Sequence, residues 1–324
     1  MKPPKSRTGE GAGDIDREHI AAAYQRTSSH IRRTPIIAIE PADLGISGVA
    51  APVTLKLEYL QHAGSFKARG AFTAMLSGAI GAIGVAAASG GNHGVAVAFA
   101  ARRLGHKATI FVPEISSPAK IRRIRDLGAD LVVGGSRYAD ALAACESFTA
   151  NSGATGIHAY DAPETLLGQG GVGFELEMQA PGIDTLLVAV GGGGLIGGIA
   201  AWYEHRIRIV AVEPETSNAL SAAFAAGGPV DVEVSGIAAD SLGARRIGTL
   251  MWPLAERFVH DAVVVSDAAI TAAQRQLWER VRVVAEPGGA TALAALTAGV
   301  YRPARDERVA VLVCGANTDA VRFD

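Results

Sequence analysis

Short apolar runs alternate with amphipathic stretches along most of the chain. The apolar runs predict strands at residues 53–60, 84–88, 108–112, 131–133, 157–159, 186–190, 207–212, 262–265 and 309–313. Apolar positions at helical spacing predict helices at residues 71–76, 95–104, 117–127, 138–150, 195–205 and 268–281. Strand–helix–strand alternation is typical of parallel sheets covered by helices on both faces. We therefore predict an α/β fold with mainly parallel sheets, and 324 residues suffice for two doubly wound domains.

The composition excludes several classes of protein. A hydrophobic fraction of 49% with only 19% charged residues excludes a disordered chain, which needs low hydrophobicity and high charge. The formal net charge of −2 does not indicate binding to nucleic acid or to an anionic membrane. Cys145 and Cys314 form neither a disulfide framework nor a zinc motif. We therefore predict a cytoplasmic protein with a small-molecule substrate and no metal.

Targeting and membrane segments are not predicted. The polar, Pro- and Gly-rich start of the chain predicts a disordered tail over residues 1–14 rather than a signal peptide, because it has no apolar core. Two uncharged stretches, residues 70–101 and 185–203, approach the length of a membrane-spanning helix. Both contain central glycine clusters and are rich in Ala, which favours buried strands that run into ligand-binding turns.

A glycine-rich loop follows one of the predicted strands. Residues 191–194 are all glycine, so backbone N–H groups there can face an anion, and the next helix adds its positive end. This predicts a phosphate site, although close packing of helix on strand also uses small residues. The loop fits GxGxxG through Gly192, Gly194 and Gly197, and Glu213 lies 21 positions after Gly192. An NAD(P)-dependent oxidoreductase therefore stays open as an alternative.

Lys67 is the lysine best placed for chemistry. It follows a turn, precedes a predicted helix and borders the uncharged stretch 70–101, so we expect partial burial. Burial lowers the pKa of a lysine and frees its amine to attack a carbonyl carbon. The alternative is a surface lysine at the start of a helix. Lys56 alternates with Leu55 and Leu57, which predicts that it faces solvent or pairs with a carboxylate.

Four motifs occur in order along the chain. They are Gly-Ser-Phe-Lys-Ala-Arg-Gly-Ala at 64–71, Ser-Gly-Gly-Asn-His-Gly at 89–94, Gly-Gly-Gly-Gly-Leu at 191–195 and Cys-Gly-Ala-Asn at 314–317. Together they resemble the fold-type II pyridoxal-phosphate enzymes, which have the tryptophan synthase β-like fold. Within that group they resemble the serine/threonine dehydratase (ammonia-lyase) branch, which includes serine racemase. The resemblance runs from about residue 16 to the end of the sequence.

The resemblance implies how the cofactor, pyridoxal 5′-phosphate, would be held. Lys67 would form a Schiff base with its aldehyde, and Phe66 would pack on its pyridine ring. Asn92 would bond to the ring hydroxyl, and Cys314 would face the pyridine nitrogen. The phosphate would be bound by five consecutive residues, Gly191, Gly192, Gly193, Gly194 and Leu195.

The resemblance also implies a turn that holds the α-carboxylate of the substrate, made of Ser89, Gly91, Asn92 and His93. Glu286 would line the same site. Each residue has a structural alternative. Asn92 and His93 are suited to capping a helix, Cys314 to packing as an inert buried thiol, and Glu286 to a salt bridge.

These assignments predict the reaction. A thiol opposite the pyridine nitrogen, unlike a carboxylate, does not keep the ring protonated, so loss of a β-substituent competes well with other fates of the carbanion. We therefore predict β-elimination from L-threonine and/or L-serine to a 2-oxo acid and ammonia, with Lys67 as the base. The alternatives are another β-substituted substrate of the hydroxyaspartate or diaminobutyrate type, an amino-acid racemase, and a ligand-binding protein without activity.

Two departures from the family pattern narrow these alternatives. Serine racemase carries a proton-donating serine where this chain has Gly90, so racemisation is disfavoured. Some relatives bind a divalent cation through a glutamate and an aspartate six positions later, whereas here Glu213 is followed at that spacing by Ala219. The resemblance further implies a homodimer, a large cofactor-binding domain (residues 15–76 and 160–324) and a small mobile domain (residues 77–159) that closes on the substrate.

Overall fold

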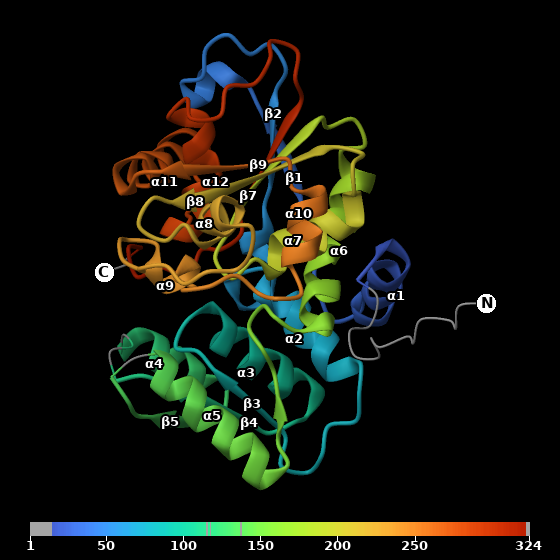
Figure 1. Ribbon diagram of the computed structural model, residues 1–324, viewed down its shortest axis with the longest axis vertical. Helices are drawn as coiled ribbons and strands as arrows, with labels where there is room; N and C mark the ends of the chain where they lie inside the picture. Colours follow the sequence, from blue (N-terminus) through green and yellow to red (C-terminus); the bar gives the residue numbers. More distant parts are fainter. Residues whose placement is uncertain (1–14, 115, 117, 137, 322–324) are drawn as a thin grey trace, which may run out of the picture.

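The computed structural model describes residues 15–321 except 115, 117 and 137, so the predicted tail over residues 1–14 lies outside the described residues. Its strands form two sheets, one above the other in Figure 1. The larger sheet has the order β1-β2-β10-β7-β8-β9, and every neighbouring pair is parallel except β1 with β2. Its strands are β1 (Ile36–Ile39), β2 (Val53–Lys56), β7 (Thr185–Ala189), β8 (Arg208–Pro214), β9 (Asp261–Val265) and β10 (Val309–Leu312).

The smaller sheet has the order β5-β4-β3-β6 and is parallel throughout. Its strands are β3 (Val85–Ala88), β4 (Ala108–Val112), β5 (Asp130–Val133) and β6 (Thr155–Gly156). They come from one continuous part of the chain, whereas the larger sheet combines strands from before and after it. The domain limits that we predict from the resemblance, and the mobility of the smaller part, stay predictions.

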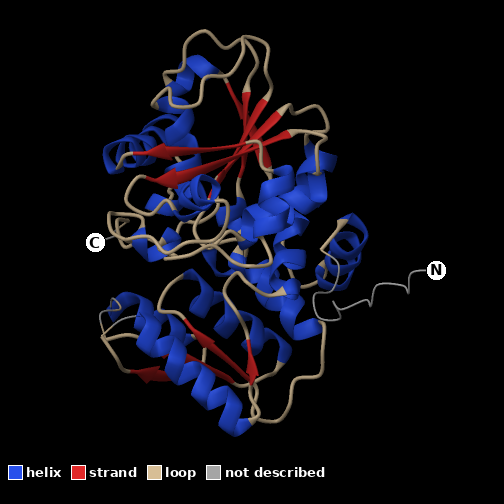
Figure 2. Cartoon of the chain, viewed as in Figure 1, coloured by secondary structure: helices blue, strands red, loops and turns tan. Residues whose placement is uncertain are grey.

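Helices lie on both sides of the strands (Figures 1 and 2). The helices are α1 (Arg17–Thr27), α2 (Lys67–Leu76), α3 (Asn92–Leu104), α4 (Pro118–Asp126), α5 (Tyr138–Ser152), α6 (Pro163–Gln179), α7 (Gly194–Tyr203), α8 (Ala219–Ala226), α9 (Ala239–Leu242), α10 (Trp252–Phe258), α11 (Asp267–Val281) and α12 (Pro287–Thr297). Short 3₁₀ turns are η1 (Pro41–Leu44), η2 (Glu58–Leu60) and η3 (His62–Gly64). None of these described helices is long and apolar enough to cross a membrane.

The core explains why the central strands are continuous apolar runs. Every residue of β7 and β10 is buried, because helices cover both faces of the parallel sheet. Helix α12 packs against strands β7, β8, β9 and β10, and α6 packs between α2 and α7. A second buried cluster joins α2 and α3 to the smaller sheet. The arrangement confirms the predicted α/β class with mainly parallel sheets.

Two predicted strands differ from the observed ones. The strand predicted at 53–60 ends at Lys56, and the chain then forms η2. Glu58, the first residue of η2, is buried in an ion pair with Arg69, which a continued strand would not allow. The strand predicted at 157–159 is instead the two-residue β6. Lys56 does not face solvent; it is completely buried and pairs with Glu175, the second of the two predicted arrangements.

Candidate active site

Three of the four motifs follow strands of the larger sheet at the edge where ligands bind in parallel sheets. The segment after β2 leads into α2, the glycine loop connects β7 with α7, and Cys314 lies two residues beyond β10. The carboxyl ends of neighbouring parallel strands share one edge, and β2, β10 and β7 are neighbours. The fourth motif follows β3 of the smaller sheet and opens α3.

Lys67 is the first residue of α2 and is held beside Cys314 by the backbone. Ser65 forms an isolated antiparallel bridge with Gly315, and the Phe66 N–H donates to the Cys314 carbonyl at 3.2 Å. The Lys67 Nζ donates to the Ala159 carbonyl at 2.7 Å. The side chain keeps some exposure, but desolvation of the ammonium lowers the pKa of Lys67 to about 8. Its amine is therefore far more available than that of an ordinary lysine.

Phe66 and Cys314 complete the surroundings of this amine. The Lys67 Nζ lies 5.1 Å from the centre of the Phe66 ring. Cys314 is buried, and its Sγ donates to the Gly288 carbonyl at 3.4 Å. Burial, together with the negative charge of Glu286, raises the pKa of Cys314 well above its usual value. The thiol is therefore neutral and offers no negative charge to a neighbouring group.

The glycine loop forms a cradle that side chains would fill. A Cβ at Gly192 would overlap the Tyr160 ring, and one at Gly193 would overlap Met251. Gly193 has φ of 87°, a conformation that favours glycine. Because α7 starts at Gly194, the unpaired N–H groups of its first turn add to the loop as an anion site.

Glu213 does not support the dinucleotide interpretation of this loop. It is completely buried, and its carboxylate accepts bonds from the backbone N–H groups of Leu220 and Ser221 at 2.7 and 2.8 Å. It also accepts a bond from the Ser221 hydroxyl at 2.7 Å. Both of its oxygens therefore bind the start of α8, and this carboxylate is not directed to a ribose.

The predicted carboxylate turn lies between β3 and α3. The Ser89 hydroxyl accepts a bond from the Gly91 N–H at 3.1 Å, which shapes the turn. A Cβ at Gly90 would overlap the hydroxyl of Ser116, which follows β4. The place of a side chain at position 90 is therefore taken by a hydroxyl from another segment, which the sequence alone did not indicate.

His93 is buried, and its imidazole ring carries no charge. The Nε2–H donates to the Ile157 carbonyl at 2.8 Å. Burial and the nearby charge of Lys67 lower the pKa of His93 to about 3, so the ring is neutral. What it offers to the turn is its backbone rather than a positive charge.

Asn92 connects the two sheets. Its Nδ2 donates to Glu286, the N-cap of α12, at 2.6 Å. Its Oδ1 accepts a bond from Asn317 at 2.5 Å, and Asn317 also donates to the Ala63 carbonyl at 2.9 Å. Arg123 of α4 donates to the amide oxygen of Asn317, its Oδ1. Glu286 is therefore buried at the site and bound to a predicted cofactor residue.

The residues present fit pyridoxal phosphate. The glycine cradle suits its phosphate, and the amine of Lys67 suits its aldehyde. Two buried polar side chains, Ser65 and Gln169, have atoms without a hydrogen-bond partner among the described residues. Gln169 lies beside the cradle, since its Oε1 is 2.9 Å from the place of a Cβ at Gly194. Buried polar groups are normally hydrogen-bonded, so these atoms are suited to bind a ligand. Ser65, Gln169 and Tyr160 were not predicted from the sequence as site residues.

Comparison with known proteins decides the family. The family model "Pyridoxal-phosphate dependent enzyme" matches residues 27–315. The chain belongs to the pyridoxal-phosphate dependent enzymes. Its cofactor is pyridoxal phosphate, as predicted, and the same glycine loop is therefore not evidence for an NAD(P)-dependent oxidoreductase.

Similar members of the family include dehydratases and a racemase. Phenylserine dehydratase of Ralstonia pickettii is 36% identical and covers 95% of each chain. Biosynthetic L-threonine dehydratase of Escherichia coli is 36% identical over 98% of this chain, which spans only 61% of that relative's length. The solved structure of maize serine racemase has a TM-score of 0.88, with 31% identity and 94% of each chain covered. These relatives confirm the predicted dehydratase and serine racemase branch.

Proposed function

We propose that this enzyme removes water from β-hydroxy amino acids, L-threonine and/or L-serine, and yields a 2-oxo acid and ammonia. The observation that carries the proposal is the pairing of a half-buried lysine amine with a neutral buried thiol, which the backbone bond from Phe66 to Cys314 holds together. A thiol in place of a carboxylate favours loss of a β-substituent over reactions that need a protonated pyridine ring.

When bound, pyridoxal phosphate supplies an aldehyde that condenses with amines and a ring that delocalises negative charge. Lys67 would hold this aldehyde and, once the amine of the substrate has replaced it there, would act as a free amine that takes the proton from Cα. The glycine loop would bind the phosphate, and the turn of Ser89, Gly91, Asn92 and His93 would bind the α-carboxylate. Lys67 would then return the proton to the β-hydroxyl, which leaves as water, and the released enamine would react with one water to give the 2-oxo acid and ammonia.

The role of each site residue is part of this proposal, as is closure of the small domain, residues 77–159, to exclude water from the site. Tyr160 and Asn317 support it by bordering the glycine cradle and the carboxylate turn. The homodimer and the cytoplasmic location that the sequence predicts stay predictions.

Ammonia release across a panel of amino acids tests the function. We expect turnover of L-threonine or L-serine by the wild-type enzyme and none by Lys67→Ala. Phenylserine and hydroxyaspartate belong in the panel, because activity confined to either would replace the proposed substrate within the same reaction class. A racemised product without ammonia would contradict the proposal.

A further inference from the structure

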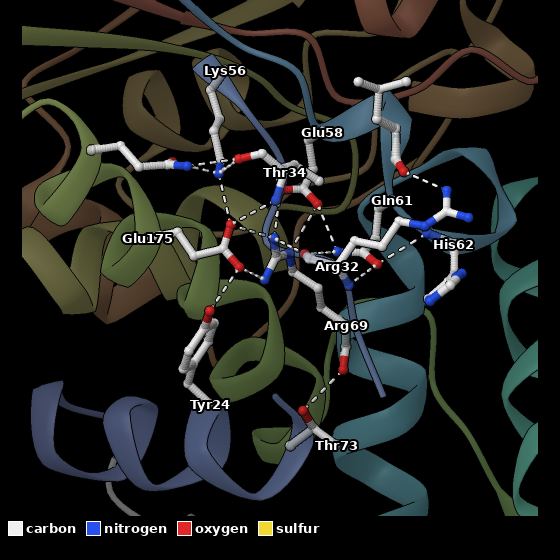
Figure 3. Close-up of polar contacts among 12 residues, drawn as sticks. Tyr24, Arg32, Thr34, Lys56, Glu58, Gln61, His62, Arg69, Thr73 and Glu175 are labelled. Atoms are coloured by element: carbon white, nitrogen blue, oxygen red, sulfur yellow. Dashed lines mark hydrogen bonds and ion pairs between the residues drawn. The ribbon is translucent and has the colours of Figure 1, made fainter. Parts of the chain in front are cut away.

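Four charged side chains with no solvent exposure lie together behind the lysine-bearing helix. They are Lys56, Glu58, Arg69 and Glu175, which we call the Arg69 network (Figure 3). Two positive and two negative charges balance. The four residues come from β2, η2, α2 and α6, so elements distant in the sequence converge at one point.

Arg69 is the centre of this network because it binds two carboxylates at once. Its Nε and Nη2 donate to Glu58 at 2.9 and 3.0 Å. Its Nη1 and Nη2 donate to Glu175, both at 2.9 Å. Paired bonds of this kind define direction as well as distance, which a lysine cannot do. The orientation of Arg69, and with it of α2, is therefore determined on two sides.

Lys56 completes the network from β2. Its Nζ donates to Glu175 at 2.7 Å, to the Thr34 carbonyl at 2.7 Å and to Gln179 at 2.8 Å, so all three protons are used. Burial would raise the pKa of Glu175, but Arg69 and Lys56 outweigh it and lower that pKa. Glu175 is therefore held as a carboxylate, and Lys56 has an acceptor for each of its protons.

The network connects the two ends of the cofactor site. Arg69 follows Lys67 by two positions, and residues two apart project from nearly opposite sides of a helix. Arg69 therefore lies on the side of α2 that is turned away from the site and fixes it there, whereas Lys67 lies on the side that faces the site. Its partner Glu175 belongs to α6, which also carries Gln169 beside the glycine cradle. Helices α2 and α6 touch closely, since a Cβ at Gly168 would overlap Thr73 of α2.

Stability alone explains this arrangement poorly. Desolvation of buried charges offsets most of their attraction, so a buried ion network is a weak source of net stability compared with apolar packing. What the network supplies instead is a fixed position of α2 relative to α6. A cofactor held covalently at one end and by its phosphate at the other requires a constant separation between Lys67 and the glycine loop.

We propose that Arg69 is a positioning residue that sets the place of the Lys67 amine relative to the glycine loop, through its paired bonds to Glu58 and Glu175. The inference rests on the proposed function, in which Lys67 carries the cofactor. Arg69 touches neither cofactor nor substrate in this role. It acts through α2 and α6.

The test uses the full-length enzyme with Arg69→Lys, which keeps the charge and loses the paired geometry. The readout is the concentration of free pyridoxal phosphate at which half of the chains carry the cofactor on Lys67, measured by borohydride reduction and peptide mapping. We expect this concentration to rise roughly tenfold or more, because displacement of about 1 Å is costly at such sites. Glu175→Gln, which breaks one paired contact with little change in volume, provides a second variant if Arg69→Lys does not fold.

Leu277→Ala is the matched control. Leu277 is fully buried on α11, so its loss should lower the melting temperature through a cavity that lies away from the network. Unchanged half-saturation in Arg69→Lys and Glu175→Gln would overturn the proposal, and so would an equal rise in Leu277→Ala. A reduced cofactor found on a residue other than 67 in the wild-type enzyme would instead refute the proposed function.

Discussion

The amine of Lys67 should react in a pH range set by its environment. Its pKa is lowered to about 8, so below that pH the fraction of reactive amine falls by about tenfold per pH unit and above it levels off. An ordinary lysine, with a pKa of about 10.4, would continue to gain reactive amine as the pH rises above 8. The measurement is the rate at which cofactor-free enzyme takes up pyridoxal phosphate on residue 67 as pH is raised. A rate that still climbs at about pH 10 would contradict the expected burial.

Gly90 should tolerate a side chain only if Ser116 gives way. A Cβ at position 90 overlaps the Ser116 hydroxyl, and such overpacking costs about 1–3 kcal/mol. We expect Gly90→Ala to lower the melting temperature and raise the KM for the amino acid. The double variant Gly90→Ala with Ser116→Gly should recover most of the melting temperature, whereas no recovery would show that the two positions do not share this space.

The residues of the site that sequence could predict are those within short motifs. Lys67, Asn92 and Cys314 lie where their motifs place them, because each motif follows a strand or opens a helix. The Arg69 network could not be predicted in the same way. Lys56 and Glu175 are 119 positions apart, and alternation with leucine made Lys56 compatible with either a solvent-facing or a paired side chain. Only the packing of α6, which carries Glu175, against α2 decides between these two arrangements of Lys56.

Among the elements, the glycine loop should be the most sensitive to an added methyl group. Gly192→Ala would overlap the Tyr160 ring, so either the loop or the ring must move away from the phosphate site. We expect the half-saturating concentration of pyridoxal phosphate to rise by roughly tenfold, the usual scale for a displaced binding group. Gly228→Ala is the control, since nothing lies within 4 Å of its Cβ and its conformation is ordinary. Equal effects of the two substitutions would exclude a specific role for the cradle.

Helices α11 and α6 differ in how far the sequence predicts them. Helix α11 matches its prediction to within a residue, because Ser266 caps it and its apolar positions follow a helical period. Helix α6 escaped prediction, since Gly168, Gly170, Gly171 and Gly173 weaken its helical propensity. Those glycines allow α6 to approach α2 and α7 closely, so tertiary packing outweighs propensity there.

At the scale of the whole molecule, the side-chain amide of Asn317 is one of the links between the two sheets. Asn317 donates to Ala63 and to Asn92 and accepts a bond from Arg123, so it joins the end of the larger sheet to α3 and α4 beside the smaller one. Each bond contributes about 1 kcal/mol. Asn317→Ala should therefore let α3 open roughly tenfold more often, while β7 and β8, which are inner strands of the larger sheet, stay protected. Hydrogen exchange of the holoenzyme measures this difference.

Asn151→Ala is the matched control for this prediction. Asn151 lies on α5 beside the smaller sheet, is exposed, and bonds only within its own helix to Ser147 at 3.3 Å among the described contacts. Its loss should leave exchange in α3 unchanged. If Asn317→Ala speeds exchange equally in α3 and in β7, the amide stabilises the whole chain rather than the junction. The proposed closure of the smaller domain would then need another contact, because a hinge that transmits substrate binding must be able to loosen without unfolding the larger sheet.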